Sequence, residues 1–279
     1  MISLIDINKT YSTGFVKTYI LRGINLEIKE GESVLITGIN GIGKTTLLRL
    51  MAGVLLPQGG RITFSDKLGP DPRSRIGFIS DKMNVYENMS LDQAIRFHSR
   101  VYGIDGFDKE LIRQAKLKTH QKISKLSRGQ KLVFHLSLLL AARPQLLLID
   151  EIIHSMDVYL RDIFLNRLLE MIEQNRITLV LVNLNFHDIE KIPQRILLLK
   201  DNQIALDEPM DSLKTRIKKV FSDREIPNLP VLFHKQHEDG HEYYIYPFER
   251  DQISGASVQV TDLNLHEIIK ALIGGEYAE

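Results

Sequence analysis

Short apolar runs alternate with amphipathic stretches over most of this 279-residue chain. The runs at residues 33–37, 146–149 and 177–182 are mainly apolar, which is typical of strands buried on both faces of a parallel sheet. Helical spacing of apolar positions predicts helices over residues 44–52, 91–102, 109–118, 130–142 and 158–175. Further strands are predicted at residues 2–7, 19–28, 61–64, 76–79, 195–199 and 203–206. This alternation predicts an α/β core with a mainly parallel sheet covered by helices on both faces.

The pattern changes after about residue 216. Strands are predicted at residues 231–233 and 243–246, and the sequence His-Glu-Asp-Gly at residues 237–240 predicts a hairpin turn between them. A last helix is predicted at residues 265–272, before Gly274 and Gly275. We therefore predict a large unit at residues 1–216 and a small C-terminal α+β appendage at residues 217–279.

Composition removes several classes of protein. The 36 Lys and Arg residues nearly balance the 35 Asp and Glu residues, and a net charge of +1 does not favour nucleic acid as a partner. The chain has 0 Cys, which excludes disulfides, thiolate zinc sites and a cysteine nucleophile. No apolar run reaches the roughly 20 residues that span a bilayer, and the start lacks the features of a signal peptide. A role at a membrane would therefore require a partner.

A glycine-rich segment follows the strand predicted at residues 33–37. It reads Gly38-Ile39-Asn40-Gly41-Ile42-Gly43-Lys44-Thr45, which fits the pattern G-x-x-x-x-G-K-[ST], and a predicted helix follows it. Such a loop turns its backbone N–H groups toward phosphate oxygens, and the helix N-terminus adds favourable partial charge. Lys44 can reach the β- and γ-phosphates, and the Thr45 hydroxyl can bind Mg²⁺. The segment predicts a site for a nucleoside triphosphate.

Two carboxylates end the apolar strand at residues 146–149. Asp150 is placed to bind Mg²⁺, directly or through water. Glu151 can polarise an attacking water as a general base. An acidic pair after a strand is weak evidence alone, but together with the phosphate loop (residues 38–45) it indicates nucleotide hydrolysis.

The segment Leu126-Ser127-Arg128-Gly129-Gln130 begins a predicted helix shortly before this acidic strand. With the phosphate loop and the acidic pair, it resembles the L-S-G-G-Q signature of the ATP-binding cassette (ABC) family. The resemblance covers about residues 1–216. It implies a P-loop NTPase fold with a mainly parallel core sheet, an N-terminal antiparallel β region and an inserted helical subdomain at about residues 83–126.

The resemblance also implies roles for individual residues. Tyr11 would stack on adenine, and the phosphates of ATP with Mg²⁺ would lie against the loop residues Gly38, Asn40, Gly41, Gly43, Lys44, Thr45 and Thr46. Because cassettes hold two nucleotides head to tail in a dimer, Ser127, Gly129 and Gln130 would face the γ-phosphate bound to the opposing subunit. Asp157 matches an aspartate that lies at the dimer interface. Separate transmembrane permease subunits would hold this subunit at the cytoplasmic face of the cell membrane, and no nucleic acid is expected.

Two polar residues that the family pattern expects are missing, besides the change of a signature glycine to Arg128. Asp81 stands where a glutamine is usual; it can still accept a hydrogen bond from water or bind Mg²⁺, but it cannot donate as the amide does. Leu184 stands where a histidine contacts the γ-phosphate, and His187 lies three residues further on. Losing a hydrogen bond made only in the transition state costs roughly 10²–10³ in rate, so slow or partner-dependent hydrolysis is expected.

Three functions stay open from the sequence. The first is the ATPase subunit of an ABC transporter, of the exporter type because residues 265–275 resemble the tail of ATPases linked to drugs, antibiotics and lipids. The second is a catalytically impaired cassette that pairs with an active one. The third, ranked last, is a soluble ABC factor of translation or DNA repair, because such factors resemble tandem or interrupted cassettes and this chain has one uninterrupted cassette.

Overall fold

The computed structural model describes residues 1–14, 16–80, 86–104, 106–151, 156–174, 177–182, 189, 191–253 and 258–274. Its central sheet has six strands in the order β5-β6-β7-β3-β8-β9. The strands are β5 (Ile76–Ser80), β6 (Leu146–Asp150), β7 (Thr178–Val182), β3 (Ser33–Thr37), β8 (Arg195–Lys200) and β9 (Gln203–Pro209). All neighbours pair in parallel except β8 and β9, which are antiparallel. The predicted mainly parallel sheet is confirmed.

Strands β3, β6 and β7 in the middle of this sheet are buried on both faces, which explains their continuous apolar runs. Alternate residues of one strand belong to two separate hydrophobic cores: Leu35 lies in one, and Val34 and Ile36 lie in the other. The first core contains the helices on one face, and the second contains α1 (Lys44–Met51) and the N-terminal strands. A polar residue at either set of positions would lose its water without gaining a partner.

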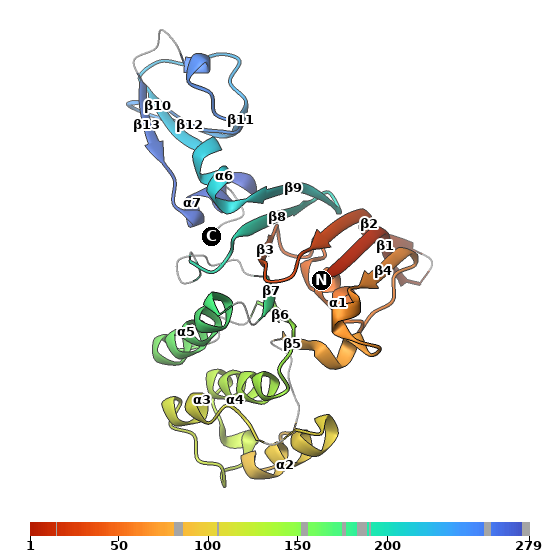
Figure 1. Ribbon diagram of the computed structural model, residues 1–279. Helices are drawn as coiled ribbons and strands as arrows, with labels where there is room; N and C mark the ends of the chain where they lie inside the picture. Colours follow the sequence, from red (N-terminus) through yellow and green to blue (C-terminus); the bar gives the residue numbers. More distant parts are fainter. Residues whose placement is uncertain are drawn as a thin grey trace.

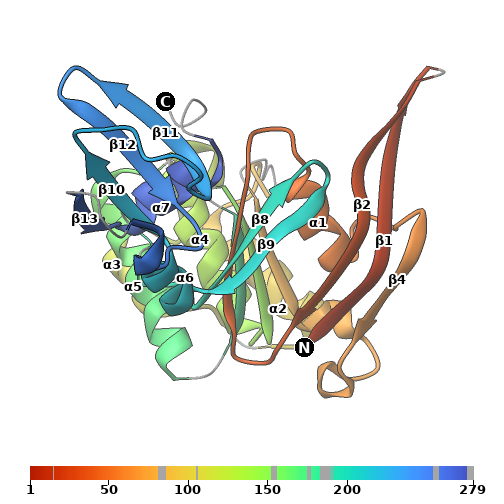
Figure 2. The same cartoon turned by 90° about the horizontal axis from the view of Figure 1, so that it is seen from above.

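The N-terminal strands form a separate antiparallel sheet in the order β2-β1-β4. They are β1 (Ile2–Thr13), β2 (Val16–Ile28) and β4 (Gly59–Phe64). Helix α1 lies between this sheet and the central one (Figure 1). Viewed from above, the N-terminal sheet and the C-terminal sheet lie on opposite sides of the central sheet (Figure 2). This arrangement confirms the predicted N-terminal antiparallel region.

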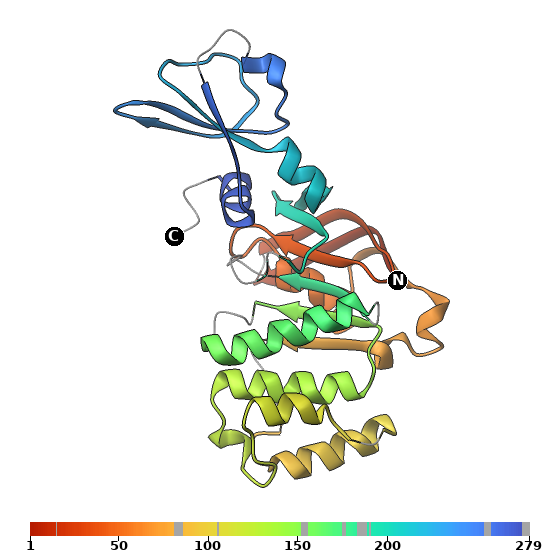
Figure 3. The same ribbon diagram turned by 60° about the vertical axis from the view of Figure 1, so that its left-hand side comes forward.

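On the other face of the central sheet, α4 (Arg128–Ala141) and α5 (Val158–Glu173) lie next to the strands. Helices α2 (Leu91–Tyr102) and α3 (Lys109–Gln114) lie beyond them, further from the sheet (Figure 3). The helix predicted at residues 109–118 ends earlier, at Gln114, because Lys116 has a φ of 53° and leaves the right-handed helical region. Helix α4 begins two residues before its predicted start, because Ser127 caps it.

The C-terminal part forms a third sheet, with all strands antiparallel in the order β11-β12-β10-β13. Helix α6 (Met210–Arg216) leads into this sheet. The elements that follow are β10 (Lys218–Ser222), β11 (Val231–His237), β12 (Gly240–Ile245), β13 (Val258–Asp262) and α7 (Leu265–Leu272). The predicted hairpin and last helix are confirmed, whereas β10 and β13 were not predicted, because each has only two apolar residues among five. Helices α6 and α7 lie between this sheet and the rest of the chain (Figure 1). Short 3-10 helices occupy Asp66–Leu68, Pro72–Arg75, Ile123–Lys125 and Arg250–Ile253.

None of the helices in the described part of the chain has the length and apolar character that a bilayer span requires.

Candidate nucleotide-binding site

The phosphate loop runs from the end of β3 into the first turn of α1. Gly38, Gly41 and Gly43 have φ values of 142°, 80° and 112°, a region that side chains rarely adopt. A Cβ at Gly43 would lie 2.8 Å from Cγ2 of Ile20, and a Cβ at Gly38 would lie 2.4 Å from the carbonyl oxygen of Leu199. The glycines therefore let β2 and β8 pack directly against the loop and fix its curvature.

Lys44 begins α1 and turns back over the loop. Its ammonium donates to the carbonyl oxygens of Gly38 at 2.7 Å and Ile39 at 3.0 Å. The side chain is buried, and this burial lowers the pKa of Lys44, while the carboxylates of Glu151 and Asp150 act in the opposite direction. A buried cation beside the backbone of the glycine loop suits an anionic ligand of several charges, such as a triphosphate.

Thr45 and Asp150 meet across the floor of this site. The Thr45 hydroxyl donates to Oδ1 of Asp150 at 2.9 Å. Two oxygen ligands on adjacent corners of an octahedral Mg²⁺ shell, each about 2.0–2.1 Å from the ion, lie about 2.9 Å apart. The pair therefore fits Mg²⁺ binding. Burial raises the pKa of Asp150, and the Thr45 hydrogen bond, Arg49 and Lys44 oppose this rise.

Glu151 follows Asp150 in a left-handed backbone conformation with a φ of 45°. Its backbone N–H donates to the carbonyl oxygen of Val182 at 3.0 Å, which ties the turn to the end of β7. Such a conformation costs about 1–3 kcal/mol and persists where the surroundings fix it. The electrostatic influence of Glu151 on Lys44 shows that its carboxylate lies near the loop. The structure thus brings together Lys44, Thr45, Asp150 and Glu151, as the sequence predicts.

The signature segment (residues 126–130) forms the N-terminal turn of α4. Oγ of Ser127 accepts from the backbone N–H of Gln130 at 3.2 Å, and Oε1 of Gln130 accepts from the N–H of Ser127 at 3.0 Å. This capping box satisfies two N–H groups of the helix start and leaves Ser127 exposed. Helix α4 lies with α2 and α3, away from α1 and the phosphate loop (Figure 1).

Gly129 of this turn packs against the start of α5. A Cβ at Gly129 would lie 3.1 Å from Cδ1 of Leu160 and 3.5 Å from Cα of Met156. Asp157 caps α5 and accepts from the N–H of Leu160 at 3.0 Å. The structure therefore brings Asp157 to the signature turn of its own chain.

The remaining predicted residues are placed as follows. Tyr11 lies on β1 and is 42% exposed, with the Lys9 ammonium 5.8 Å from its ring centre. Asn40 is exposed on the loop and Thr46 is buried in α1. Asp81, Leu184 and His187 lie outside the described residues, so their roles stay predictions.

Asn202 was missed by the sequence reasoning. It lies in the turn between β8 and β9 with a φ of 64°, and its side-chain amide donates to the carbonyl oxygens of Tyr19 and Ile20, both at 3.1 Å. The backbone N–H of Arg22 donates to the Asn202 carbonyl at 2.9 Å. Asn202 thus holds the turn between β8 and β9 against β2, beside the place where Ile20 of β2 packs on Gly43. An Asp-Asn pair signals a turn in sequence, but not this contact.

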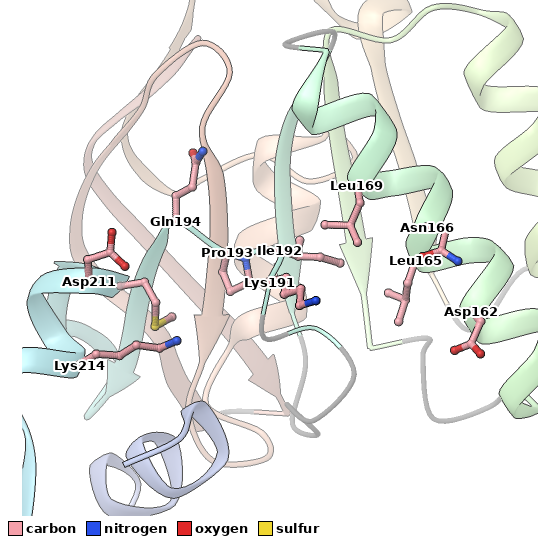
Figure 4. Close-up of a pocket in the computed structure, with 11 residues that line it drawn as sticks. Asp162, Leu165, Asn166, Leu169, Lys191, Ile192, Pro193, Gln194, Asp211 and Lys214 are labelled. Atoms are coloured by element: carbon pink, nitrogen blue, oxygen red, sulfur yellow. The ribbon is translucent and has the colours of Figure 1, made fainter. Parts of the chain in front are cut away.

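A surface hollow of about 840 Å³ lies elsewhere, between α5, the segment before β8, and α6 (Figure 4). Leu165, Leu169 and Ile192 supply apolar surface, and charges of both signs surround it. No predicted site residue lines it. This hollow is therefore not part of the nucleotide site.

A strand, a glycine loop with a buried lysine, and a paired threonine and aspartate at the carboxyl edge of a parallel sheet define a P-loop nucleoside triphosphatase. Residues 21–154 match the family model described as ABC transporter. The chain is 31% identical to the methionine import ATP-binding protein MetN 3 of Shouchella clausii, over 82% of this chain and 71% of that protein. It is 29% identical to the energy-coupling factor transporter ATP-binding protein EcfA1 of Oenococcus oeni, over 79% of this chain and 81% of that protein.

Solved structures agree with this match. The dimeric structure of MJ0796, a bacterial ABC transporter cassette, has a TM-score of 0.66 and 26% identity, covering 75% of this chain and 99% of that one. A dimeric post-hydrolysis state of the same cassette, bound to ADP and Pi, has a TM-score of 0.65 and 25% identity, with the same coverage. The chain belongs to the ABC transporter ATP-binding family. It is accordingly an ABC-type ATPase that uses ATP and Mg²⁺.

Proposed function

We propose that this chain hydrolyses ATP as one half of a cassette dimer and drives a separate transmembrane permease. The observation that carries the proposal is the division of site residues into two groups. Lys44, Thr45, Asp150 and Glu151 form one group, and the signature turn with Asp157 forms the other on a different part of the chain. Two copies, or one copy and a related cassette, complete each site by joining unlike groups.

Each residue of the first group has a defined part in hydrolysis. Lys44 and the loop N–H groups bind the phosphates, and the ring of Tyr11 stacks on adenine. Thr45 and Asp150 would hold Mg²⁺, which would supply neutralising charge to the β- and γ-phosphates. Glu151 orients the attacking water and accepts its proton, and Asp81 accepts a hydrogen bond from that water.

The second group acts on the nucleotide held by the other cassette. Ser127, Gly129 and Gln130 face the γ-phosphate at the N-terminus of α4, where partial positive charge favours an anion. Asp157 stands at the dimer interface. Closure of the dimer then depends on ATP, and hydrolysis reopens it.

The permease docks on α2 at the cytoplasmic face of the membrane. Phe97 and Val101 lie four residues apart and are 46% and 60% exposed, so they form an apolar stripe. A neighbouring hollow of about 400 Å³ is lined by Asn88, Met89, Gln93, Arg96, Phe97 and Arg100. An amphipathic coupling helix fits such a surface.

The direction of transport is a separate proposal. Relatives whose names include methionine import favour an importer, whereas the C-terminal resemblance that predicted an exporter is short. In proteoliposomes with the cassettes facing outward, external ATP would move solute out of the lumen for an importer and into it for an exporter. Either result selects one direction.

An impaired cassette is the second candidate function, because Asp81 and Leu184 replace two polar residues of the family pattern. Such a subunit would close on ATP while a partner cassette performs hydrolysis. We also propose the division at residues 216 and 217, which the separate hydrogen bonding of the C-terminal sheet supports.

The test measures Mg²⁺-dependent ATP hydrolysis against protein concentration for the purified chain and Glu151→Gln. We expect turnover that rises more steeply than the concentration and falls about 10²-fold or more in Glu151→Gln. ATP binding without turnover in the unmodified chain would favour the impaired cassette. Turnover proportional to concentration at all concentrations would contradict the dimer.

A further inference from the structure

A run of positive charge leads into the signature turn. Residues 116–131 contain no Asp or Glu, and their cations are Lys116, Lys118, Lys122, Lys125, Arg128 and Lys131. Arg128 and Lys131 fall in the first turns of α4, three residues apart on neighbouring positions of the helix surface. Cations at this end of α4 are repelled by the partial positive charge of the helix N-terminus. The turn therefore needs a nearby carboxylate to hold Lys131 in place.

Glu87 supplies that carboxylate from a distant part of the chain. Its Oε1 lies 2.8 Å from Nζ of Lys131, and the side chains are 43% and 27% exposed, respectively. Lys131 directly follows Gln130, and its backbone N–H donates to the carbonyl oxygen of Ser127 at 2.9 Å. The ion pair thus attaches to the same turn that carries the signature residues.

Backbone hydrogen bonds fix the position of Glu87 relative to the segment that precedes α4. The N–H of Ser124 donates to the carbonyl of Glu87 at 3.2 Å, and the N–H of Ile123 donates to that of Met89 at 3.0 Å. The N–H groups of Leu91 and Asp92 donate to the carbonyls of Gln121 and Thr119. These hydrogen bonds hold residues 87–92 against the segment that leads into the signature turn.

We propose that Glu87 and Lys131 are a positioning pair that fixes the orientation of the signature turn toward the nucleotide of the opposing cassette. This role rests on the proposed function, because it requires a cassette dimer. The pair touches neither the phosphate loop nor Glu151. Its loss therefore weakens dimer closure and turnover, while ATP binding to the single cassette stays unchanged.

The expected size follows from the exposure of the pair. Partly exposed ion pairs contribute about 0.2–1 kcal/mol, which is a factor of roughly 1.4–5 in an equilibrium constant. A symmetric dimer contains the pair twice, so the dimer dissociation constant changes by roughly 2–30-fold. The effect shrinks at high salt, because salt screens exposed charges.

The experiment measures ATP-dependent dimerisation by sedimentation in the Glu151→Gln background, with kcat and KM measured in the hydrolysing chain. Glu87→Gln and Lys131→Gln are each expected to raise the dimer dissociation constant by roughly 2–30-fold and to lower kcat. Binding of a fluorescent ATP analogue to the dilute monomer should stay within about twofold. Lys131→Arg keeps the charge and should behave like its parent, and the swap Glu87→Lys with Lys131→Glu should restore most of the dimerisation.

Glu30→Gln is the matched control, because Glu30 pairs with Lys67 at 2.5 Å on an exposed surface. It should alter neither dimerisation nor turnover. Single variants that dimerise like their parent, or a swap as weak as the single variants, would overturn the positioning role. A Glu151→Gln parent that stays monomeric with ATP would instead refute the proposed dimer, and the positioning role with it.

Discussion

Replacing Gly38 by alanine tests whether the packing of β8 shapes the phosphate loop. The added Cβ would lie 2.4 Å from the carbonyl oxygen of Leu199, inside the 3.0 Å below which Cβ contacts are essentially not observed. Leu199 is fully buried in β8, so its backbone cannot move away without disturbing the sheet. The φ of 142° at Gly38 is also unfavourable for alanine.

Gly41→Ala is the matched variant, because Gly41 has a φ of 80° but nothing lies within 4 Å of its Cβ position. We expect Gly41→Ala to lower the free energy of unfolding by about 1–2 kcal/mol through backbone strain alone. Overpacking adds about 1–3 kcal/mol at Gly38, so Gly38→Ala should unfold at a clearly lower urea concentration.

Urea unfolding followed by circular dichroism measures both variants beside the unmodified chain. In a thermal melt of the same variants, overpacking at Gly38 should make the melting temperature of Gly38→Ala roughly 2–10 °C lower than that of Gly41→Ala. If Gly38→Ala were as stable as Gly41→Ala, the reasoning that β8 confines the loop would be wrong. Equal slopes of the unfolding transitions are needed for this comparison.

Two further outcomes are expected. Asn202→Ala should lower the free energy of unfolding by about 1–2 kcal/mol and weaken ATP binding, because two hydrogen bonds to β2 are lost. An ATP affinity equal to that of the unmodified chain would contradict a role of Asn202 in supporting the phosphate loop through β2. Burial lowers the pKa of His135 to about 3, with His98 contributing, so the unfolded chain binds more protons between pH 3 and 6.5 and stability falls as pH falls through this range. His135 alone should therefore lower the free energy of unfolding by about 1.4 kcal/mol between pH 7.5 and pH 5.5. His135→Leu should remove this part of the pH dependence and leave the part due to buried His98, whose pKa is also lowered by burial. An unchanged pH dependence in that variant would refute the assignment.

The sequence by itself predicted which segments form the candidate site. The phosphate loop, the acidic pair after β6 and the signature turn are short segments, so their residue order alone specifies the local geometry that binds phosphate or caps a helix. The buried strands were equally predictable, because a strand covered on both faces must be apolar throughout. Strands β10 and β13 escaped prediction because each has only two apolar residues among five, too few to form such a run.

Only the tertiary structure decided which distant residues support these segments. Asn202 binds Ile20 across 182 positions, Leu199 confines Gly38, and Glu87 reaches Lys131 across 44 positions. Periodicity reports whether a residue is buried or exposed, but it carries no information about which partner it meets. That choice depends on the packing of whole strands and helices, because the free energy that holds these contacts comes from surfaces buried together in the folded chain.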